Sequence, residues 1–398
     1  MKTPRTSQRL GVGGFASILA AVLLTLPGLA QAQLSYTTTN GTITITGGCP
    51  TSPGALTIPE TINGLPVTSV GDRAFSHCKS LTSITIPSSV TNIGNQAFQA
   101  CTSLTSITIP NSVTNIGDGA FSYCTSLTNV VAGNSVTNIG NQAFQACTSL
   151  TAIEVDPANP IYTSLSGVLF NKGQTRLIAY PGGKTGAYII PDTVNVIGSY
   201  AFSYCASLTS ITIPNSVRSI WPWAFWYCTS LASITIPNRV TYLSEWAFAY
   251  CTNLTSITIP NSVLYIGASA LQGCTRLKGA YFQGNAPDPA WNAFYGATNA
   301  TVYYLPGTTG WGPNFVGRPT ALWTSPFLAP GSVALSGNGF AFTTAWAANT
   351  TLVVEACLDL ANPAWSPIAT NTPWSGVWYF TDPNWTNYPT RFYRVRSP

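Results

Sequence analysis

Apolar and polar residues alternate in a short pattern that recurs along most of the chain. Its clearest copy, CTSLTSITIPNSVTNIGDGAF, runs from Cys101 to Phe121 and contains an L-x-x-I-x-I motif from Leu104 to Ile109. Because β-branched residues alternate with Thr at the end of this motif, it predicts a short strand with one face inward. Pro110 cannot donate a ladder hydrogen bond, so the strand is expected to end there. Val113 and Ile116 are then expected to point back into the core.

The pattern recurs with a period of 23 residues. The period is marked by Cys78, Cys101, Cys124 and Cys147, and again by Cys205, Cys228, Cys251 and Cys274. A fixed period of this length is typical of a solenoid, in which each short coil buries its apolar side against its neighbours. We expect columns of Leu, Ile, Phe and Cys in the core, with coils about 4.8 Å apart. The A-F-x-x-C segment of each coil is expected to form about one helical turn.

The cysteine column admits two interpretations. Disulfides between adjacent coils are compatible with Cα atoms about 5 Å apart, but in-register Cβ atoms would lie farther apart than the roughly 3.8 Å that a disulfide prefers. We therefore expect an unpaired column of buried thiols that behave as small hydrophobes. No metal site is expected, because C-x-x-C pairs are absent and His77 is the only histidine. Cys49 and Cys357 lie outside the repeat and are too far apart in the sequence for their pairing to be judged.

Two longer phrases, IGNQAFQACTSLTSITIPNSVTNIG and IGSYAFSYCASLTSITIPNSV, resemble the BspA-like leucine-rich repeats of bacterial and some protozoan surface proteins. The shared features are the spacing, the A-F-x-x-C corner and the I-P-x-S-V turn, over roughly residues 55–280. The resemblance implies a curved solenoid on a secreted or cell-surface protein that binds proteins or takes part in adhesion. The family has no shared catalytic residues, so the resemblance assigns no residue a role.

The expected fold is a repeat solenoid of the leucine-rich-repeat type, with one β-strand and a short helical or irregular segment per coil, followed by a small all-β module. The expected divisions are a signal peptide at 1–32, an N-terminal cap at 33–70, the solenoid at 71–280, a C-terminal cap at 281–325 and a β-sandwich-like module at 326–398. Within the solenoid an irregular unit spans about 151–197. Its segments VLF and RLIAY flank Asn171-Lys172-Gly173 and predict a hairpin that projects from the array.

The period is expected to end near Tyr281, beyond which several aromatic residues would close the last coil. They are Trp291, Phe294, Tyr303, Tyr304, Trp311 and Phe315. The same cluster is also open to interpretation as a ligand platform. After Pro326, short strand candidates separated by turn residues predict the sandwich-like module.

The first residues have the pattern of a secretory leader. Basic residues in MKTPRTSQRL precede an apolar run from Phe15 to Leu26, and Ala30-Gln31-Ala32 follows as a cleavage pattern. A membrane anchor would need about 20 apolar residues, and this run is shorter. Without the three basic residues of the leader, the formal charge of +5 falls to about +2. This near-neutral balance argues against electrostatic binding of nucleic acid or anionic membranes.

The sequence contains few groups suited to catalysis, since only 7% of its residues are charged. Glu154, Asp156 and Asp192 surround the irregular unit, and Glu154 replaces a strand Thr, so it is expected to face solvent and is a candidate contact for a ligand. A paired-carboxylate glycosidase is conceivable, but the sequence gives no pairing geometry. His77 is explained by substitution at a repeat position. The chain lacks G-x-S-x-G, a phosphate-binding Gly loop and a zinc signature, so we expect neither enzyme activity nor a cofactor.

Variation among the coils is the best guide to a binding site. After the irregular unit, three coils carry aromatic residues both before Ala and before Cys, and Trp221 and Trp226 lie nearby. If these segments are helical turns, each pair shares one face. The candidate contacts are Tyr200, Tyr204, Trp223, Trp226, Tyr227, Trp246, Tyr250 and Glu154. Mutual packing of the rings is the alternative to a binding patch.

Three functions remain open. The first is a secreted or surface-associated protein that recognises an extracellular protein through its solenoid. The second is an extracellular carbohydrate-binding or carbohydrate-active protein, and the third is a spacer that displays its C-terminal module. In each case the partner is expected to be an extracellular protein or glycan, whereas nucleic acid and a membrane span in the mature chain are not expected.

Overall fold

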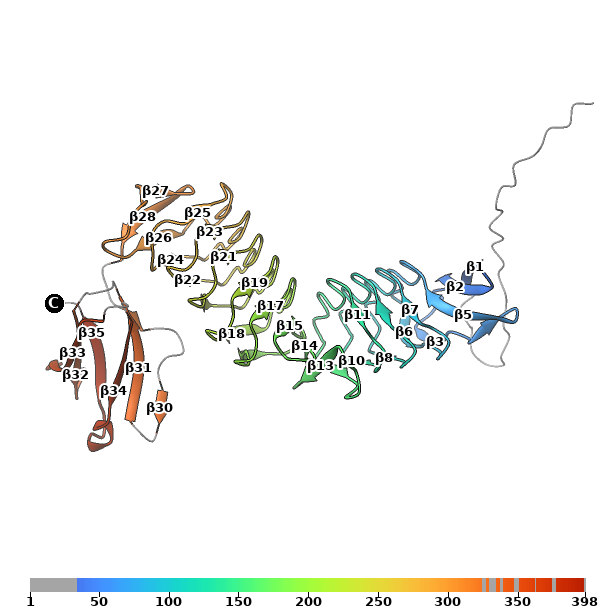
Figure 1. Ribbon diagram of the computed structural model, residues 1–398, viewed down its shortest axis with the longest axis horizontal. Coiled ribbons are helices and arrows are strands. Elements are labelled where there is room, and N and C mark those ends of the chain that lie inside the picture. Colours follow the sequence, from blue (N-terminus) through green and yellow to red (C-terminus); the bar gives the residue numbers. More distant parts are fainter. Residues whose placement is uncertain are drawn as a thin grey trace, which may run out of the picture.

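The structure is a computed structural model that describes residues 34–323, 327–328, 334–336, 339–346, 351–361, 363–373 and 377–396. The expected signal peptide, residues 1–32, lies outside the described residues. The expected fold class is confirmed, because stacked coils form a long solenoid and an all-β module follows it (Figure 1). Two stretches of the solenoid meet at an angle near the green strands β13 and β14 (Figure 1).

One strand of each coil belongs to a parallel ladder, as the alternation of Ile and Thr predicts. The first stretch of the ladder contains β3 (Gly54–Thr57), β6 (Leu81–Thr85), β8 (Ser106–Ile109), β10 (Asn129–Ala132) and β12 (Ala152–Val155). After the irregular unit, β16 (Gly186–Ile189) pairs with β18 (Leu208–Thr212) alone. A separate sheet contains β20 (Ser233–Thr235), β22 (Ser256–Ile259), β24 (Gly279–Phe282), β26 (Thr301–Tyr304) and β28 (Arg318–Leu322), with β27 (Asn314–Phe315) antiparallel to β28. Repeat-equivalent residues are paired in register, for example Thr235 with Thr258.

A second ladder is built mainly from two-residue strands. Its first stretch contains β5 (Leu65–Val70), β7 (Asn92–Ile93), β9 (Asn115–Ile116) and β11 (Asn138–Ile139), and its second contains β17 (Val196–Ile197), β19 (Ser219–Ile220), β21 (Tyr242–Leu243), β23 (Tyr265–Ile266) and β25 (Asp288–Pro289). At the N-terminal end, β1 (Ser35–Thr39) and β2 (Thr42–Gly47) form a hairpin, β2 pairs with β5, and β4 (Thr61–Ile62) also pairs with β5. Buried Tyr36, Ile43 and Ile45 close the core there.

The segment between the two ladders is a turn, so the expected helical turn is wrong. The residues before Ala and before Cys in each coil have positive φ, as at Trp223 (58°) and Tyr227 (60°). Every second N–H of this corner donates to a carbonyl of the next coil, for example Phe98 to Ala120 at 2.8 Å. A helical turn would direct these donors along its own axis. The corner therefore links the coils as a third ladder of backbone hydrogen bonds.

The irregular unit is part of the core, so the expectation of a projecting hairpin is wrong. β14 (Val168–Asn171) pairs antiparallel with β13 (Tyr162–Leu165) and with β15 (Arg176–Ala179), and β15 continues the second ladder through β17. Val168 and Phe170 pack in the core of the second stretch, whereas Leu169 packs in the core of the first. The run VLF lacks polar alternation because both faces of this strand are buried. The hairpin therefore separates the hydrophobic core of the first stretch from that of the second.

The cysteine column differs from expectation at its first member. Cys78 forms a disulfide with Cys49, and the repeat cysteines from Cys101 to Cys274 are free and buried. In the regular coils each thiol donates to the Phe carbonyl of the preceding coil, as Cys124 does to Phe98 at 3.1 Å. Cys78 belongs to the first complete coil, where its sulfur is bonded to Cys49 of the cap instead of donating to a Phe carbonyl. The column thus supplies hydrogen-bond donors as well as small apolar volume.

The coils continue beyond residue 280, where the period was expected to end. Phe294 and Ala297 occupy the Phe and Cys places of one more coil, and Tyr303 pairs in register with Tyr281. Ala in place of Cys concealed this coil in the sequence. Phe315 and Trp311 pack on Phe282, at ring-centroid distances of 5.7 and 5.0 Å, and help to close the core. Trp291 does not contribute to this closure, because 84% of its surface is exposed.

The C-terminal module is a sandwich of two antiparallel sheets. One contains β29 (Phe327–Leu328), β30 (Ala334–Ser336), β31 (Gly339–Ala345) and β34 (Val377–Asp382), and the other contains β32 (Leu352–Cys357), β33 (Ser366–Asn371) and β35 (Phe392–Arg396). Phe342, Val354 and Phe380 fill the space between them. The 3₁₀ helix η1 (Trp385–Asn387) is the sole helix of the described part, and no described helix is long and apolar enough to cross a membrane.

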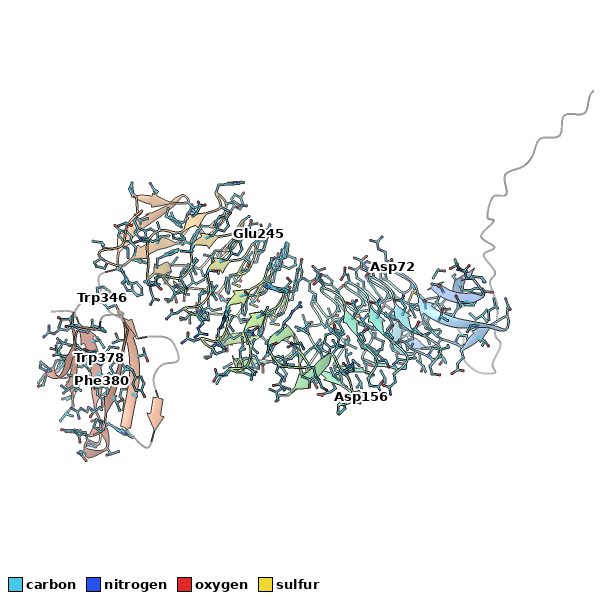
Figure 2. The ribbon with its side chains drawn as sticks, in the orientation of Figure 1. Asp72, Asp156, Glu245, Trp346, Trp378 and Phe380 are labelled. Atoms are coloured by element: carbon cyan, nitrogen blue, oxygen red, sulfur yellow. A yellow bond between two sulfur atoms is a disulfide. The ribbon has the colours of Figure 1, made fainter. Side chains whose placement is uncertain are left out.

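An aromatic joint attaches the module to the last coils. Tyr281 and Tyr303 replace the Thr of the strand face and stack at 5.0 Å, and Trp323 packs on Tyr281 at 4.9 Å. Trp346 of the module meets Trp323 edge to face at 6.2 Å, and Leu352 joins the same cluster. Figure 2 shows Trp346 at the end of the module that faces the solenoid, with Trp378 and Phe380 deeper in the sandwich.

Candidate functional site

The structure brings seven of the eight predicted contact residues together on the corners of three consecutive coils. We call this set, Tyr200, Tyr204, Trp223, Trp226, Tyr227, Trp246 and Tyr250, the aromatic strip. All seven side chains are half-buried. Their backbone positions follow from the corner geometry, because residues with positive φ direct their side chains away from the core that Ala and Phe fill. The strip therefore lies on the surface with its inner edge supported by the coils.

The rings of the strip stack along the solenoid axis. Tyr204, Tyr227 and Tyr250 form one column with centroid distances of 4.9 and 4.7 Å. Tyr200 and Trp223 stack at 5.1 Å in a second column. Trp226 packs edge to face against Tyr204 and Tyr227, at 5.2 and 5.1 Å. Stacking covers both faces of Tyr227 and one face each of Tyr200, Tyr204, Trp223 and Tyr250, so the rings support one another while part of their surface stays exposed.

Bulky residues occupy backbone positions that favour glycine. The two corner positions hold glycine at Gly119 and Gly273, with φ of 60° and 69°. A side chain with positive φ is strained by roughly 1 to 2 kcal/mol relative to the right-handed conformation. Six members of the strip have such a φ, and Trp226 is the exception. Arg73, Gln96 and Gln142 have a similar φ at the equivalent position of other coils, so the corner backbone does not require an aromatic residue and the rings are specific to these three coils.

A further tyrosine belongs to the strip although sequence analysis missed it. The hydroxyl of Tyr123 donates to that of Tyr204 at 3.2 Å, and the two rings meet edge to face at 5.7 Å. Tyr123 occupies the position before Cys, as Tyr204 does, so the alignment of the repeats contained the signal. The long irregular unit concealed that the two residues are neighbours in space.

Glu154 is separate from the strip. It lies in β12, paired with Val131 at the position equivalent to Thr108, and faces solvent as predicted. Its carboxylate accepts a hydrogen bond of 3.0 Å from Ser164 on the hairpin. Trp221 is not part of the strip either, because the guanidinium of Arg176 lies over its ring, 4.3 Å from the ring centroid.

The strip is electrically neutral at physiological pH. Burial raises the pKa of Tyr204, and the hydrogen bond from Tyr123 raises it further. Burial likewise raises the pKa of Tyr200. Because both phenols stay protonated, they offer hydroxyl donors and acceptors to a neutral or weakly polar partner surface.

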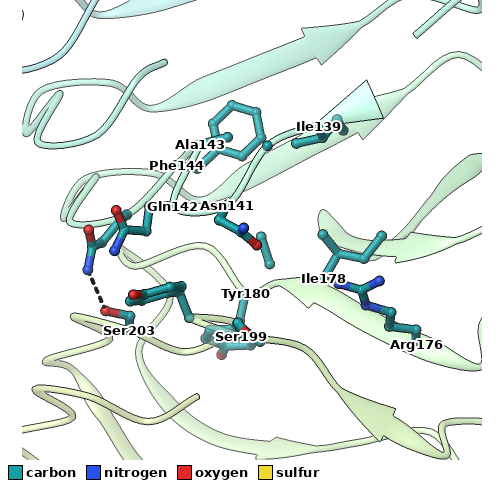
Figure 3. A pocket seen from close by; sticks show the side chains of 15 residues that line it. Ile139, Asn141, Gln142, Ala143, Phe144, Arg176, Ile178, Tyr180, Ser199 and Ser203 are labelled. Carbon is teal, nitrogen blue, oxygen red and sulfur yellow. Dashed lines mark hydrogen bonds between the residues drawn. The ribbon is translucent and has the colours of Figure 1, made fainter. Parts of the chain in front are cut away.

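A small cavity opens where the two stretches of the solenoid meet. It is lined by Gln142 and Phe144 on one side and by Tyr180, Ser199 and Ser203 on the other (Figure 3). Its volume is about 40 Å³, room for a few water molecules. The side chain of Gln145 spans it and donates to Ser203 at 3.0 Å. The cavity is therefore a packing gap between two coils, and it is too small for an organic ligand.

Carboxylate groups are spread along the solenoid. Figure 2 shows Asp72, Asp156 and Glu245 at separate places along the solenoid. The carboxylate of Asp156 accepts the N–H of Ala158 at 2.8 Å, a local turn interaction. In the described residues no three His, Cys, Asp or Glu side chains are grouped to hold a metal ion. His77 is a corner residue with φ of 61°, as expected for a substitution at a repeat position.

The corner of the last complete coil carries two exposed aromatic side chains. Trp291 and Tyr295 have 84% and 66% of their surface exposed. In the preceding coil the residues one period before Trp291 and Tyr295 are Ala268 and Gln272, which carry no rings. Unlike the rings of the strip, the Trp291 ring therefore retains open surface on its faces.

Comparisons with known proteins agree with this architecture. The sequence profile of the family described as BspA type leucine rich repeat region, in six copies, matches residues 55–173 and 179–301. The chain is similar to a leucine-rich repeat protein from Eubacterium ventriosum, with 26% identity, a TM-score of 0.54, and coverage of 68% of this chain and 82% of that one.

Two further solved structures are similar in sequence. A leucine rich cell surface protein from Faecalibacterium prausnitzii is 28% identical, with a TM-score of 0.45 and coverage of 73% and 95% of the two chains. A leucine-rich repeat protein from Bacteroides ovatus is 28% identical, with a TM-score of 0.46 and coverage of 70% and 71%. No curated protein matches the chain.

Proposed function

Because the chain belongs to the BspA-type leucine-rich repeat family, we propose that it is a secreted or surface-associated protein that binds an extracellular protein through the aromatic strip. The leader-like residues 1–32 support export, and repeat solenoids offer extended surfaces to protein partners. In this proposal the protein is a binding protein rather than an enzyme, and it needs no cofactor.

The observation that carries the proposal is the retention of aromatic residues where the backbone favours glycine. Six of the seven strip residues have positive φ, and all seven are half-buried rather than fully covered. Tyr and Trp supply large contact areas with few rotatable bonds, and they are enriched where binding energy concentrates in protein interfaces. The exposed ring edges and phenol groups fit a protein surface better than the flat face of a sugar ring.

The proposal is tested by replacing Trp223 and Trp246 with glycine, which one other coil carries at the equivalent position, as Gly119. The full chain and the double variant are used to capture partners from the native extracellular environment by cross-linking. Loss of the captured protein in the double variant supports the proposal. As a matched control, Tyr242→Ser removes an exposed ring that stacks on Tyr265 outside the strip. Equal capture by the parent chain and the double variant would contradict the proposal.

A second candidate function, glycan binding, is supported by Trp291. Its indole has open faces, and sugar rings stack on such faces. A glycan array probed with the full chain and with Trp291→Ala distinguishes the two functions. Saturable binding that Trp291→Ala removes, and that the Trp223→Gly and Trp246→Gly double variant retains, favours a glycan site at the last coil.

A further inference from the structure

The parallel ladder has a gap at the irregular unit. Among the described strands, β12 pairs only with β10 on its ladder side, and β16 pairs only with β18. The edge of β12 is partly covered, because Gly167 accepts the N–H of Ile153 at 2.9 Å. The ladder is interrupted again between β18 and β20, whereas β22, β24 and β26 each have a neighbour on both sides; β16 is therefore an edge strand within the array.

The free edge of β16 has its own backbone groups available for pairing. The N–H groups of Gly186 and Ile190 donate toward β18, to Ser207 and Thr212, both at 3.1 Å. Successive residues of a strand direct their N–H groups to opposite sides. The N–H and carbonyl groups of Ala187 and Ile189 therefore point away from β18, into the gap.

The apolar side of the sheet is also incompletely covered at this gap. Tyr188, Ile211 and Ile213 are partly exposed, whereas the equivalent Ile257 and Ile259 in a regular coil are fully buried. Ile189 has 73% of its surface exposed, although its partner in register is a threonine, Thr212. Natural proteins normally protect such edges with charge or proline, and the described residues of β16 carry neither.

We propose that β16 is a docking edge for one extended peptide segment of a partner protein, which adds a parallel strand to the ladder. The segment would pair with the backbone of Ala187 and Ile189. It would place a β-branched apolar residue beside Tyr188, as a regular strand does for its neighbour. Because the side chains along β16 are uncharged, the segment should be neutral, with apolar and small polar residues in alternation. Strand addition to a sheet edge is a common mode of peptide recognition.

The array itself supplies a probe with this chemistry. The synthetic peptide TSLTSITIP copies residues 102–110, a regular strand of the ladder. The full chain should bind it saturably, as measured by fluorescence anisotropy, and the amides of Ala187 and Ile189 should become protected from hydrogen exchange. Ala187→Pro, which removes a donor on the free edge, should weaken binding at least tenfold, and the matched control Ala187→Ser should not.

A pair of modified peptides keeps the test independent of how Ala187→Pro folds. One is N-methylated at its copies of Ser106 and Thr108, the other at its copies of Ile107 and Ile109. In a parallel pairing only one of these two sets faces β16, so one modified peptide should lose binding and the other should keep it. Absence of saturable binding, equal binding of both peptides, or self-association of the chain through β16 would overturn the proposal.

Discussion

The phenol oxygens of Tyr123 and Tyr204 lie 3.2 Å apart, although 81 residues separate them in the sequence. The contact joins the last coils before the irregular unit to the first coil after it. The surface of the solenoid therefore continues across a place where the strand ladder is interrupted. The irregular unit thus affects the two surfaces differently: corner residues from either side of it are in contact, whereas the strand ladder is interrupted.

The backbone at Trp223 predicts an unusual order of stabilities. Trp223→Gly relieves roughly 1 to 2 kcal/mol of strain at positive φ but removes an aromatic stack worth roughly 0.5 to 1.5 kcal/mol. These two effects nearly cancel, so the net loss of stability should reflect the half-buried contact area of the indole, about 1 to 2 kcal/mol. Trp223→Val should be less stable than Trp223→Gly by about 2 kcal/mol or more, because a β-branched residue tolerates this φ poorly. Urea unfolding of both variants measures the difference, and equal stability would contradict the assignment of strain.

Glycine at the inner bend of a coil is required for a different reason. A Cβ atom at Gly117 would lie 2.6 Å from the backbone nitrogen of Asn95 in the preceding coil. Gly117→Ala should therefore force the coils apart and lower the free energy of unfolding by about 2 kcal/mol or more. Gly173→Ala is the matched control, because the nearest atom to its added Cβ would lie 3.9 Å away. A thermal shift as small for Gly117→Ala as for the control would contradict this packing.

The buried thiols should be chemically inert in the folded chain. Burial raises the pKa of Cys147 to about 12, so only about one thiol in 10⁴ would be ionised at pH 8. Because the thiolate is the reactive form, alkylation followed by mass spectrometry should label Cys147 only after denaturation. Cys147 lies in the coil next to the gap in the strand ladder, so it gives the strictest test of whether the thiols are protected. Rapid native labelling at this residue would show that the coil opens.

The sandwich module should lose stability in acid. Arg394 and Arg396 contact the carboxylate of Glu355 at 2.7 and 2.8 Å and hold its pKa below the usual value. The unfolded chain then takes up a proton at higher pH than the folded chain does. This contribution to stability is present above the ordinary glutamate pKa of about 4.3 and is lost as pH falls through the lower folded value. Denaturant unfolding between pH 3 and 7 should show this slope.

Glu355→Gln is the variant that tests the assignment. It should remove part of the acid dependence and destabilise the module at neutral pH, since two arginines would lose their partner. Asp359→Asn serves as the control, because Asp359 is exposed and accepts a local hydrogen bond from Ala361. An unchanged pH profile in Glu355→Gln would argue against a role for this carboxylate.

The regular coils could be predicted because every copy of the repeat has the same pattern of apolar residues. Leu, Ile, Phe and Cys recur at fixed spacing, so one periodic reading places all of them in the core. The corner could not be predicted, because the pattern of apolar residues does not encode the sign of φ. Tyr at a corner position is compatible with a helical turn and with a left-handed residue alike. The structure shows that residues of positive φ precede Ala and Cys there, with Ala and Phe between them.

The irregular unit shows a second limit of sequence reasoning. The turn residues around Gly173 correctly predicted a hairpin, but they did not reveal whether its faces were covered. Val168 and Leu169 belong to two different cores, a relationship that depends on how the two stretches of the solenoid meet. The adjacency of Tyr123 and Tyr204 depends on the same junction.

Ring spacing in the aromatic strip has one further consequence. Centroids separated by 4.7 to 5.1 Å repeat almost at the interval between strands in any β-sheet. A partner surface whose side chains are spaced at this same interval can therefore contact several rings of the strip at once. Selectivity can then arise from commensurate spacing, with each single contact remaining weak.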